Sequence, residues 1–391
     1  MTLNNYYMNI MLQEKMKKTI FILIILIIIS CKLHICFATE ISSPSAVVIC
    51  EDTGRILYDK NANEKRPMAS LTKLMTAIIF VENCRMDEII QIDKKACYIG
   101  GSEVGLIPNT QITAKDLLTG MLLPSGNDAA TQIAIHIAAS TENFAKLMNI
   151  RAKELGLSNT NFVTPHGLDD ESHYSTAYEM ALISKYARNY KEIKDIVQTK
   201  YATITINNEQ KQLKNTNALL FDYPYTTGMK TGFTDDAGRC LSASASKDNL
   251  NLIAVVLGSE SSQIRFSETK QILEETFEKY NYYDLSNFTN IYINIPIIKG
   301  QKNNYIVTYS DNISEALTKE EYSNIQVKQE LLKEINAPMH KNDYIGKVTI
   351  YTGDYIIYEK EIHLEYDIQK KKVKDYMYYI LSHLFDKFEK I

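Results

Sequence analysis

The chain has 391 residues, of which 45% are hydrophobic and 23% are charged, and its formal net charge is −4. A chain of this length can hold one large domain and a smaller one, each with its own core. The slightly acidic balance gives no basic surface of the kind that nucleic-acid-binding proteins use, so no nucleic-acid partner is expected.

The N-terminal segment, residues 1–38, has the pattern of a secretory signal peptide. A few lysines precede an unbroken apolar run at 20–29, and small residues follow. This run is shorter than the ~20 apolar residues that span a bilayer. We expect export with cleavage after Ala38. Lipidation at Cys31 and a retained membrane anchor are the alternatives.

Four cysteines lie beyond this segment: Cys50, Cys84, Cys97 and Cys240. Zinc sites usually show CxxC spacing or clustered histidine partners, and these cysteines show neither. We therefore expect no metal and no cofactor. Export permits a disulfide, but buried free thiols are the favoured interpretation.

The next part of the chain reads as a hairpin, then helices, then strands. Apolar runs at 45–50 and 55–59, joined by Glu51-Asp52-Thr53-Gly54, predict the hairpin. Because the late strands follow one another without crossovers, we expect them to form an antiparallel sheet packed by helices. The periodicity predicts helices at 70–81, 114–123, 128–139, 142–155, 176–190 and 262–280, and strands at 201–206, 228–232, 239–245 and 252–258.

A second, smaller domain is predicted after a change in composition at 284–290. From 291 to 366 the chain consists of short strand-like runs separated by turns. This pattern is typical of a separate all-β domain. The predicted strands are 291–298, 305–309, 325–327, 347–350 and 355–366.

The C-terminal segment, 370–391, predicts an amphipathic helix. Its apolar and aromatic residues recur at spacings of three and four, and lysines gather at its start. Such a helix is typical of a membrane interface. Docking on the β domain is the alternative, and membrane attachment is favoured.

Three short motifs are candidates for chemistry: Ser70-Leu71-Thr72-Lys73, Ser125-Gly126-Asn127 and Lys230-Thr231-Gly232. S-x-x-K, S-D-N and K-T-G together mark class A β-lactamases and penicillin-binding proteins. Further S-x-x-K strings occur at 244–247 and 267–270, and S-D-N occurs at 310–312. Only the first three motifs occur in the order S-x-x-K, S-D-N-like and K-T-G, with the first on a predicted helix and the last on a predicted strand.

The first motif suits a serine nucleophile with a lysine base. Ser70 and Lys73, three residues apart on a helix, are neighbours. Serine needs a base to take its proton, and a neutral Lys73 can serve if burial and a second cation, Lys230, lower its pKa.

The other two motifs suit proton relay and substrate binding. Ser125 offers a hydroxyl that can pass a proton between the amines, and Asn127 offers an amide to hold the substrate or Lys73. The run at 228–232 reads as an edge strand that can pair with an extended peptide. Lys230 and Thr231 would then bind the terminal carboxylate of that peptide.

Residues 43–280 resemble the serine D-alanyl-D-alanine carboxypeptidases, the low-molecular-mass penicillin-binding proteins. In that family the middle motif is commonly S-G-N, which Gly126 fits. The resemblance implies an α+β penicillin-binding/β-lactamase-like domain at 39–283, with an antiparallel sheet flanked by helices. A small β-rich domain at 290–367 and a terminal amphipathic helix would follow. The matching stretches are Gly100-Gly101-Ser102, Ser125 to Ala130, Thr164-Pro165-His166-Gly167-Leu168, His173-Tyr174-Ser175-Thr176-Ala177 and Lys230 to Leu241.

The resemblance also implies an activity. The enzyme would remove the terminal D-alanine from peptidoglycan stem peptides ending in D-Ala-D-Ala, at the outer face of the cytoplasmic membrane. β-Lactams would acylate the same serine. The backbone N–H groups of Ser70 and Phe233 would form the oxyanion hole. The implied catalytic residues are Ser70, Lys73, Ser125 and Asn127, and the implied substrate-binding residues are Lys230, Thr231, Gly232 and Phe233.

Two positions depart from several relatives. Phe233 stands where some carry histidine, so a pH effect from that position is not expected. Asn251 stands where a basic residue occurs in several relatives, so no additional carboxylate contact is assigned there. His166 and His173 are interpreted as part of the pocket wall rather than as catalytic bases.

Three other functions compete. A D,D-endopeptidase or transpeptidase shares all three motifs. A class A β-lactamase needs a glutamate in an E-x-x-L-N stretch, and the nearest string, 154–159, places its asparagine one residue too late. A non-catalytic wall-binding protein would not need the intact set of serines and lysines.

Overall fold

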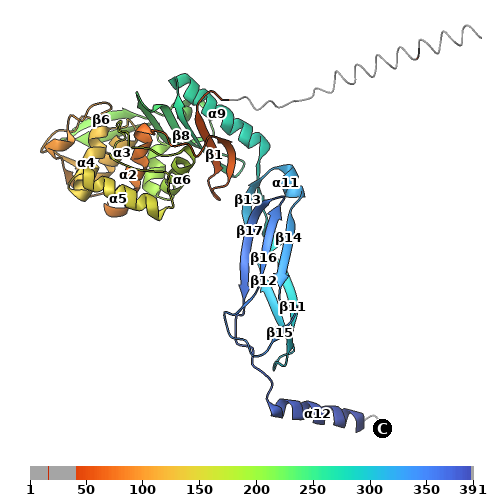
Figure 1. The fold of residues 1–391 in the computed structure, drawn as a ribbon. Helices are drawn as coiled ribbons and strands as arrows, with labels where there is room; N and C mark the ends of the chain where they lie inside the picture. The colour runs from red at the N-terminus through yellow and green to blue at the C-terminus, as the bar shows by residue number, and fades with distance from the viewer. Residues whose placement is uncertain (1–15, 17–40, 389–391) are drawn as a thin grey trace, which may run out of the picture. The chain divides into compact units, whose positions relative to one another are not determined.

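The computed structural model describes residue 16 and residues 41–388, with the side chains of 379 and 382–388 left aside. The predicted leader, including Cys31 and Ala38, lies outside the described residues. All elements discussed below belong to one unit, residues 42–391 (Figure 1).

A five-stranded antiparallel sheet forms the centre of the first domain, in the order β2-β1-β9-β8-β7. The predicted hairpin is present, and its first strand pairs with β9, which joins the two ends of the domain in one sheet. The antiparallel arrangement is confirmed, and β7 lies at an edge. The strands are β1 (Ser45–Cys50), β2 (Ile56–Lys60), β7 (Thr226–Thr234), β8 (Gly238–Lys247) and β9 (Leu250–Ser259).

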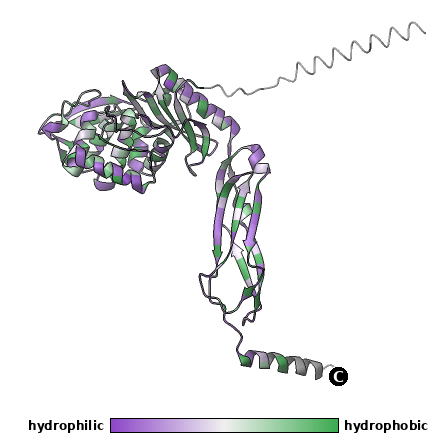
Figure 2. Ribbon diagram, viewed as in Figure 1, coloured by the Kyte–Doolittle hydropathy of each residue, from purple (hydrophilic) through white to green (hydrophobic). Residues whose placement is uncertain are grey.

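Helices cover both faces of this sheet. The short turn η1 (Ala69–Thr72) leads into α2, and α6 and α9 pack on opposite faces of β1 and β9 (Figure 1). The strands are largely hydrophobic, whereas α9 carries many hydrophilic residues (Figure 2). Hydroxyl side chains cap the starts of α3, α5, α6 and α9, which explains where these helices begin. The helices are α2 (Lys73–Asn83), α3 (Ala114–Leu122), α4 (Asn127–Ala138), α5 (Thr141–Glu154), α6 (Ala177–Ala187) and α9 (Ser262–Lys279).

One predicted strand lies outside the main sheet. β5 (Tyr201–Ile206) pairs with β6 (Glu209–Lys214) in a separate hairpin. Strand β6 was not predicted from the sequence, because five of its six residues are exposed and its sequence is almost entirely polar. Five further short elements were also missed: β3 (Ile89–Gln91), η2 (Lys94–Ala96), β4 (Gln111–Thr113), α7 (Lys191–Val197) and α8 (Leu219–Asp222).

The second domain is built from short strands around its own apolar core. Alternate residues of β11 and β12 point inward and meet residues of β15 and β16 in this core. The all-β character is as predicted, apart from two short helices. The elements are β10 (Asn281–Asp284), α10 (Ser286–Thr289), β11 (Ile291–Ile298), β12 (Asn304–Tyr309), β13 (Ser314–Leu317), α11 (Lys319–Ser323), β14 (Gln326–Leu331), β15 (Ile335–Asn336), β16 (Tyr344–Thr352) and β17 (Tyr355–His363).

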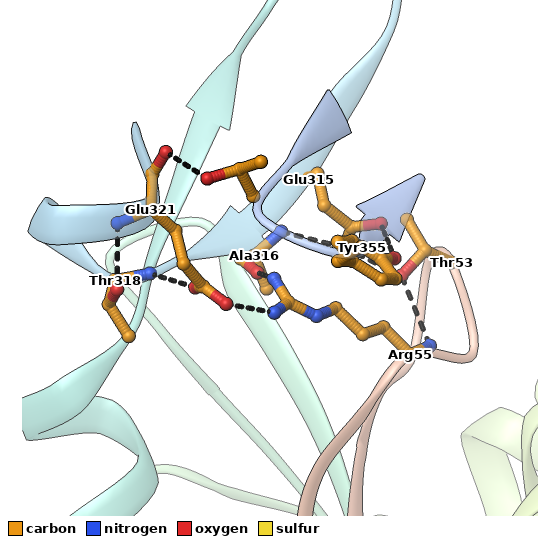
Figure 3. Close-up of polar contacts among 8 residues, drawn as sticks. Thr53, Arg55, Glu315, Ala316, Thr318, Glu321 and Tyr355 are labelled. Carbon is orange, nitrogen blue, oxygen red and sulfur yellow. Dashed lines mark hydrogen bonds and ion pairs between the residues drawn. The ribbon is translucent and has the colours of Figure 1, made fainter. Parts of the chain in front are cut away.

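Polar contacts tie the first hairpin to this β domain (Figure 3). Arg55 forms an ion pair with Glu321, and its guanidinium carbon lies 4.0 Å from the centre of the Tyr355 ring. Thr53 donates a hydrogen bond to Glu315 at 2.9 Å. These contacts join the turn between β1 and β2 to β13, α11 and β17.

The last helix is α12 (Val373–Phe388). The apolar side chains described on it are exposed, among them Val373 at 76% and Met377 at 58%. Within the described residues, no helix is long and apolar enough to cross a membrane. The four cysteines beyond the leader are buried free thiols, as predicted.

Candidate active site

Ser70 and Lys73 meet where the turn η1 becomes helix α2. Lys73 Nζ lies 2.7 Å from Ser70 Oγ. The same amine donates to Asn127 Oδ1 at 2.7 Å and to the backbone carbonyl of His166 at 2.9 Å. The S-x-x-K and S-G-N motifs, more than 50 residues apart, are therefore in direct contact.

The two motif lysines are buried without a carboxylate partner among the described residues. Lys73 is 0% exposed and Lys230 is 1% exposed. Burial, followed by the charge of Lys230, holds the pKa of Lys73 well below its usual value. Burial, followed by the charge of Arg265, lowers the pKa of Lys230 to about 7. Amines with lowered pKa can exchange protons near neutral pH, which catalytic bases require.

Gly232 lies against the backbone of the nucleophile. A Cβ atom added to Gly232 would lie 3.0 Å from the carbonyl oxygen of Met68 and 3.2 Å from the nitrogen of Ser70. Any larger residue would therefore crowd Ser70. The third motif thus lies on edge strand β7 with its glycine facing the serine. The next residue, Phe233, is 46% exposed, and its ring stacks on Arg239.

The third motif continues the buried polar cluster. Lys230 Nζ donates to the Thr231 carbonyl oxygen at 2.8 Å. Thr231 Oγ1 lies 2.6 Å from Thr216 Oγ1. Thr231 is 6% exposed, so its hydroxyl is held at the wall of the site rather than in bulk water.

The S-G-N segment is held by the loop that contains Gly100 and Ser102. Asn127 Nδ2 donates to the Gly100 carbonyl at 2.7 Å, which turns Oδ1 toward Lys73. The adjacent Asp128 accepts backbone N–H groups from 104, 105 and 106 and anchors the same loop. Ser125 has a positive φ of 72°. Its hydroxyl makes no hydrogen bond to either motif lysine within the described residues.

Two buried histidines lie next to the motif residues. His173 Nδ1 accepts from the N–H of Val163 at 2.9 Å. Its Nε2 therefore donates to Thr72 Oγ1, 2.8 Å away, and Thr72 in turn donates to the carbonyl of Ala69 at 2.7 Å. Burial lowers the pKa of His166 to about 3 and that of His173 to about 4, so both rings are neutral at pH 7. His173 lines the cavity beside Ala69, and His166 contacts the site through its backbone carbonyl, which accepts from Lys73.

Arg265 on α9 contacts the strand of the third motif and was not predicted from the sequence. Its Nη1 donates to the carbonyls of Gly232 and Cys240 at 3.1 and 3.2 Å, while its Nε is buried with no hydrogen-bond partner in the described part of the chain. Burial lowers its pKa to about 10. Asn251, to which no substrate contact was assigned from the sequence, donates from its Nδ2 to Asp52 at 3.2 Å. The available signal was an arginine on the buried face of a helix, which is uncommon without a function.

A cavity of about 260 Å³ opens beside the serine-bearing turn. Its lining residues include Ala69 and Gly167 and side chains of both charges, among them Lys65, Asp170 and Asp236. A pocket with both charges next to the nucleophile suits a polar peptide better than an apolar ligand.

Two family models match the chain. The first, described as D-alanyl-D-alanine carboxypeptidase, matches residues 34–261. The second, described as penicillin-binding protein 5, C-terminal domain, matches residues 289–370.

Individual proteins show the same similarity. D-alanyl-D-alanine carboxypeptidase DacF of Bacillus subtilis is 36% identical over 334 residues, which cover 83% of this chain and 86% of that protein. The structure of penicillin binding protein 5 from Haemophilus influenzae has a TM-score of 0.74 at 31% identity and covers 85% of this chain and 98% of its own. The Streptomyces K15 DD-transpeptidase has a TM-score of 0.58 at 31% identity and covers 61% of this chain and 98% of its own.

Proposed function

Because the chain belongs to the D-alanyl-D-alanine carboxypeptidase family, we propose that Ser70 is the residue that its substrates and β-lactams acylate. The chain is a D-alanyl-D-alanine carboxypeptidase with the mixed α/β fold of the penicillin-binding proteins, followed by a β domain of the penicillin-binding protein 5 type. The activity and the fold class predicted from the sequence are thus confirmed. The roles of single residues are our proposal.

The observation that carries the assignment is the 2.7 Å contact between Lys73 Nζ and Ser70 Oγ inside a buried site that holds two lysines with lowered pKa. Neutral Lys73 takes the Ser70 proton as Oγ attacks the carbonyl carbon of the penultimate D-alanine. The proton then passes to the leaving nitrogen, and terminal D-alanine departs. Water attacks the acyl-enzyme, and the shortened peptide leaves with Ser70 restored. We assign the proton relay to the Ser125 hydroxyl, whereas Asn127 Oδ1 holds the Lys73 amine in position.

Substrate binding is assigned to the edge of β7. The extended peptide pairs with the free backbone of this strand, and its terminal carboxylate meets Lys230 and the Thr231 hydroxyl. Arg265 adds a second buried positive charge behind Gly232. The backbone N–H groups of Ser70 and Phe233 bind the developing oxyanion, where one donor typically contributes ~3–4 kcal/mol.

A release assay tests the nucleophile. The peptide ends in D-Ala-D-Ala, and free D-alanine is measured with wild type, Ser70→Ala and Ser267→Ala. Ser267 belongs to the S-x-x-K string at 267–270 on α9 and is the matched control. We expect release to disappear only in Ser70→Ala. If Ser70→Ala retained D-alanine release and Ser267→Ala lost it, the nucleophile would be Ser267 and our assignment would be wrong.

We propose that the enzyme acts outside the cell and attaches to a membrane surface. We propose a leader at 1–38, a catalytic domain at 39–283, a β domain at 290–367 and a membrane-associating helix at 370–391. The exposed apolar residues of α12 support the last of these. The proposed location is the outer face of the cytoplasmic membrane.

Vesicle sedimentation tests the role of α12. We expect Met377→Glu combined with Ile380→Glu to release the protein from anionic vesicles, because both side chains are exposed and apolar. Tyr292→Glu, at an exposed aromatic of the β domain, is the control and should still sediment. Equal sedimentation of all three proteins would contradict attachment through α12.

A further inference from the structure

Three side chains with metal-binding atoms converge far from the serine, at the other ends of α2 and α4. Cys84 follows the last residue of α2, Glu88 lies in the turn before β3, and His136 lies in the last turn of α4. The first residues of these two helices are Lys73 and Asn127. Each helix therefore presents a catalytic side chain at its start and a metal-binding side chain at or near its end.

The donor atoms have the spacing of a shared ion. His136 Nε2 lies 3.0 Å from Glu88 Oε1. Cys84 Sγ lies 3.4 Å from Glu88 Oε2 and 3.9 Å from His136 Nε2. Ligands at ~2.0–2.3 Å from a tetrahedral zinc ion lie ~3.3–3.6 Å from one another. Small side-chain adjustments would bring all three into that geometry, and this group is the one among the described residues whose donors meet so closely.

The donor types point to zinc. A thiolate and an imidazole select zinc over calcium or magnesium, and one carboxylate completes a three-ligand set. Cys84 is 9% exposed, whereas the side chains of Glu88 and His136 are 42% and 26% exposed, so an ion can enter from solvent and keep a water at the fourth position. We propose that Cys84, Glu88 and His136 bind one zinc ion that joins the end of α2 to the end of α4.

Binding replaces a proton. In the metal-free chain the Cys84 thiol lies within hydrogen-bonding distance of Glu88, and burial with this carboxylate raises the Cys84 pKa to about 12. Zinc takes the place of that proton, so one proton leaves the thiol for each ion bound.

The role of this ion would be structural. α2 has 11 residues, and a helix rises ~1.5 Å per residue, so the site lies about 16 Å from Lys73 along the helix. The ion is too distant to touch the reacting atoms. It would instead fix the relative position of the two helices that hold Lys73 and Asn127 in contact.

Zinc titration of tag-free, chelator-treated protein tests the proposal. We expect one zinc per chain, and affinity weakened about 100-fold or more by Cys84→Ser or His136→Gln, since even second-shell changes cost 10–100-fold. Cys97→Ser is the matched control. Cys97 is another buried free thiol, and its Sγ contacts only the carbonyl of Asp93 among the hydrogen-bond partners described. Penicillin labelling of each variant confirms that it is folded.

Two further measurements distinguish a specific zinc site from nonspecific binding. Cobalt in place of zinc should give a thiolate-to-metal charge-transfer band in wild type and Cys97→Ser but not in Cys84→Ser. Zinc should raise the melting temperature of the same two proteins and leave the rate of D-alanine release within twofold. Equal zinc affinity in wild type and Cys84→Ser, no binding to either, or a cobalt spectrum without the thiolate band would overturn the proposal. None of these results bears on the role of Ser70.

Discussion

The lysines of the active site and those of the β domain lie in opposite surroundings. Lys73 and Lys230 are almost completely buried and face no carboxylate among the described residues. In the β domain, Lys347 lies at the surface and pairs with Glu359 at 3.0 Å. Burial lowers the pKa of the two active-site amines, whereas the Glu359 carboxylate raises the pKa of Lys347.

This difference separates charge that serves catalysis from charge that serves the surface. A buried amine without a carboxylate partner destabilises the fold, so such an amine persists where a reaction needs it. An exposed pair adds little stability and is screened by salt. Substitutions in the first region should therefore change activity far more than those in the second, and should change the pH dependence of stability in a way that the second cannot.

Removal of the base should have the largest effect. Lys73→Met leaves Ser70 without a proton acceptor, so the rate of acylation by fluorescent penicillin should fall by about 10²–10⁴-fold. Lys270→Met, in the second S-x-x-K string, is the control and should match wild type. A Lys73→Met rate within tenfold of wild type would remove the distinction between the two regions.

A methyl group at Gly232 should have a smaller effect on the same reaction. Gly232→Ala places Cβ about 3 Å from the backbone around Ser70 and displaces the N–H that binds the oxyanion. Loss of one such donor costs about 10²-fold in kcat. Steady-state D-alanine release should show the loss in kcat. A change confined to KM would indicate that Gly232 serves substrate binding alone.

The pH dependence of stability should distinguish Lys230 from surface lysines. Its folded pKa, about 7, is below that of an unfolded lysine, so between pH 7 and 10 the unfolded chain binds a proton that the folded chain does not. Wild-type stability therefore rises with pH in this window, by up to about 1.4 kcal/mol per pH unit from this group. Denaturant unfolding should show a weaker rise in Lys230→Met. Parallel curves for the two proteins would contradict the lowered pKa of Lys230.

The smallest effect is expected in the β domain. Lys347→Ala removes an exposed pair and should change the melting temperature by less than about 2 °C, with activity unaffected. The raised pKa of Lys347 means that its contribution is present below its unfolded pKa and is lost only above it, so no slope arises between pH 7 and 10. If Lys347→Ala altered the slope of unfolding free energy against pH as much as Lys230→Met does, the two regions would not differ as described.

The sequence predicted what local patterns encode. Apolar periodicity located the long helices within a few residues, and alternation located most strands of the β domain. Order along the chain placed Ser70, Lys73 and Asn127 in one site. Strand β6 was not predicted because its sequence does not alternate between apolar and polar residues. Few of its residues pack on a core, so no such alternation is needed.

Local sequence patterns could not predict the contacts that form when elements far apart in the sequence pack together. Arg265 reaches the K-T-G strand because α9 crosses the back of the sheet. Cys84 and His136 are 52 residues apart and meet only because α2 and α4 end side by side. The spacing rules that exclude a zinc site apply to ligands on one loop or helix, and these ligands lie on separate elements.

The account rests on Ser70 as the single acylated residue, and mass spectrometry tests it directly. Intact wild-type protein briefly exposed to penicillin should gain the mass of one penicilloyl group, and digestion should place that group on the peptide that contains Ser70. An adduct on the peptide of Ser125 or Ser267, or no adduct on folded protein, would contradict the assignment.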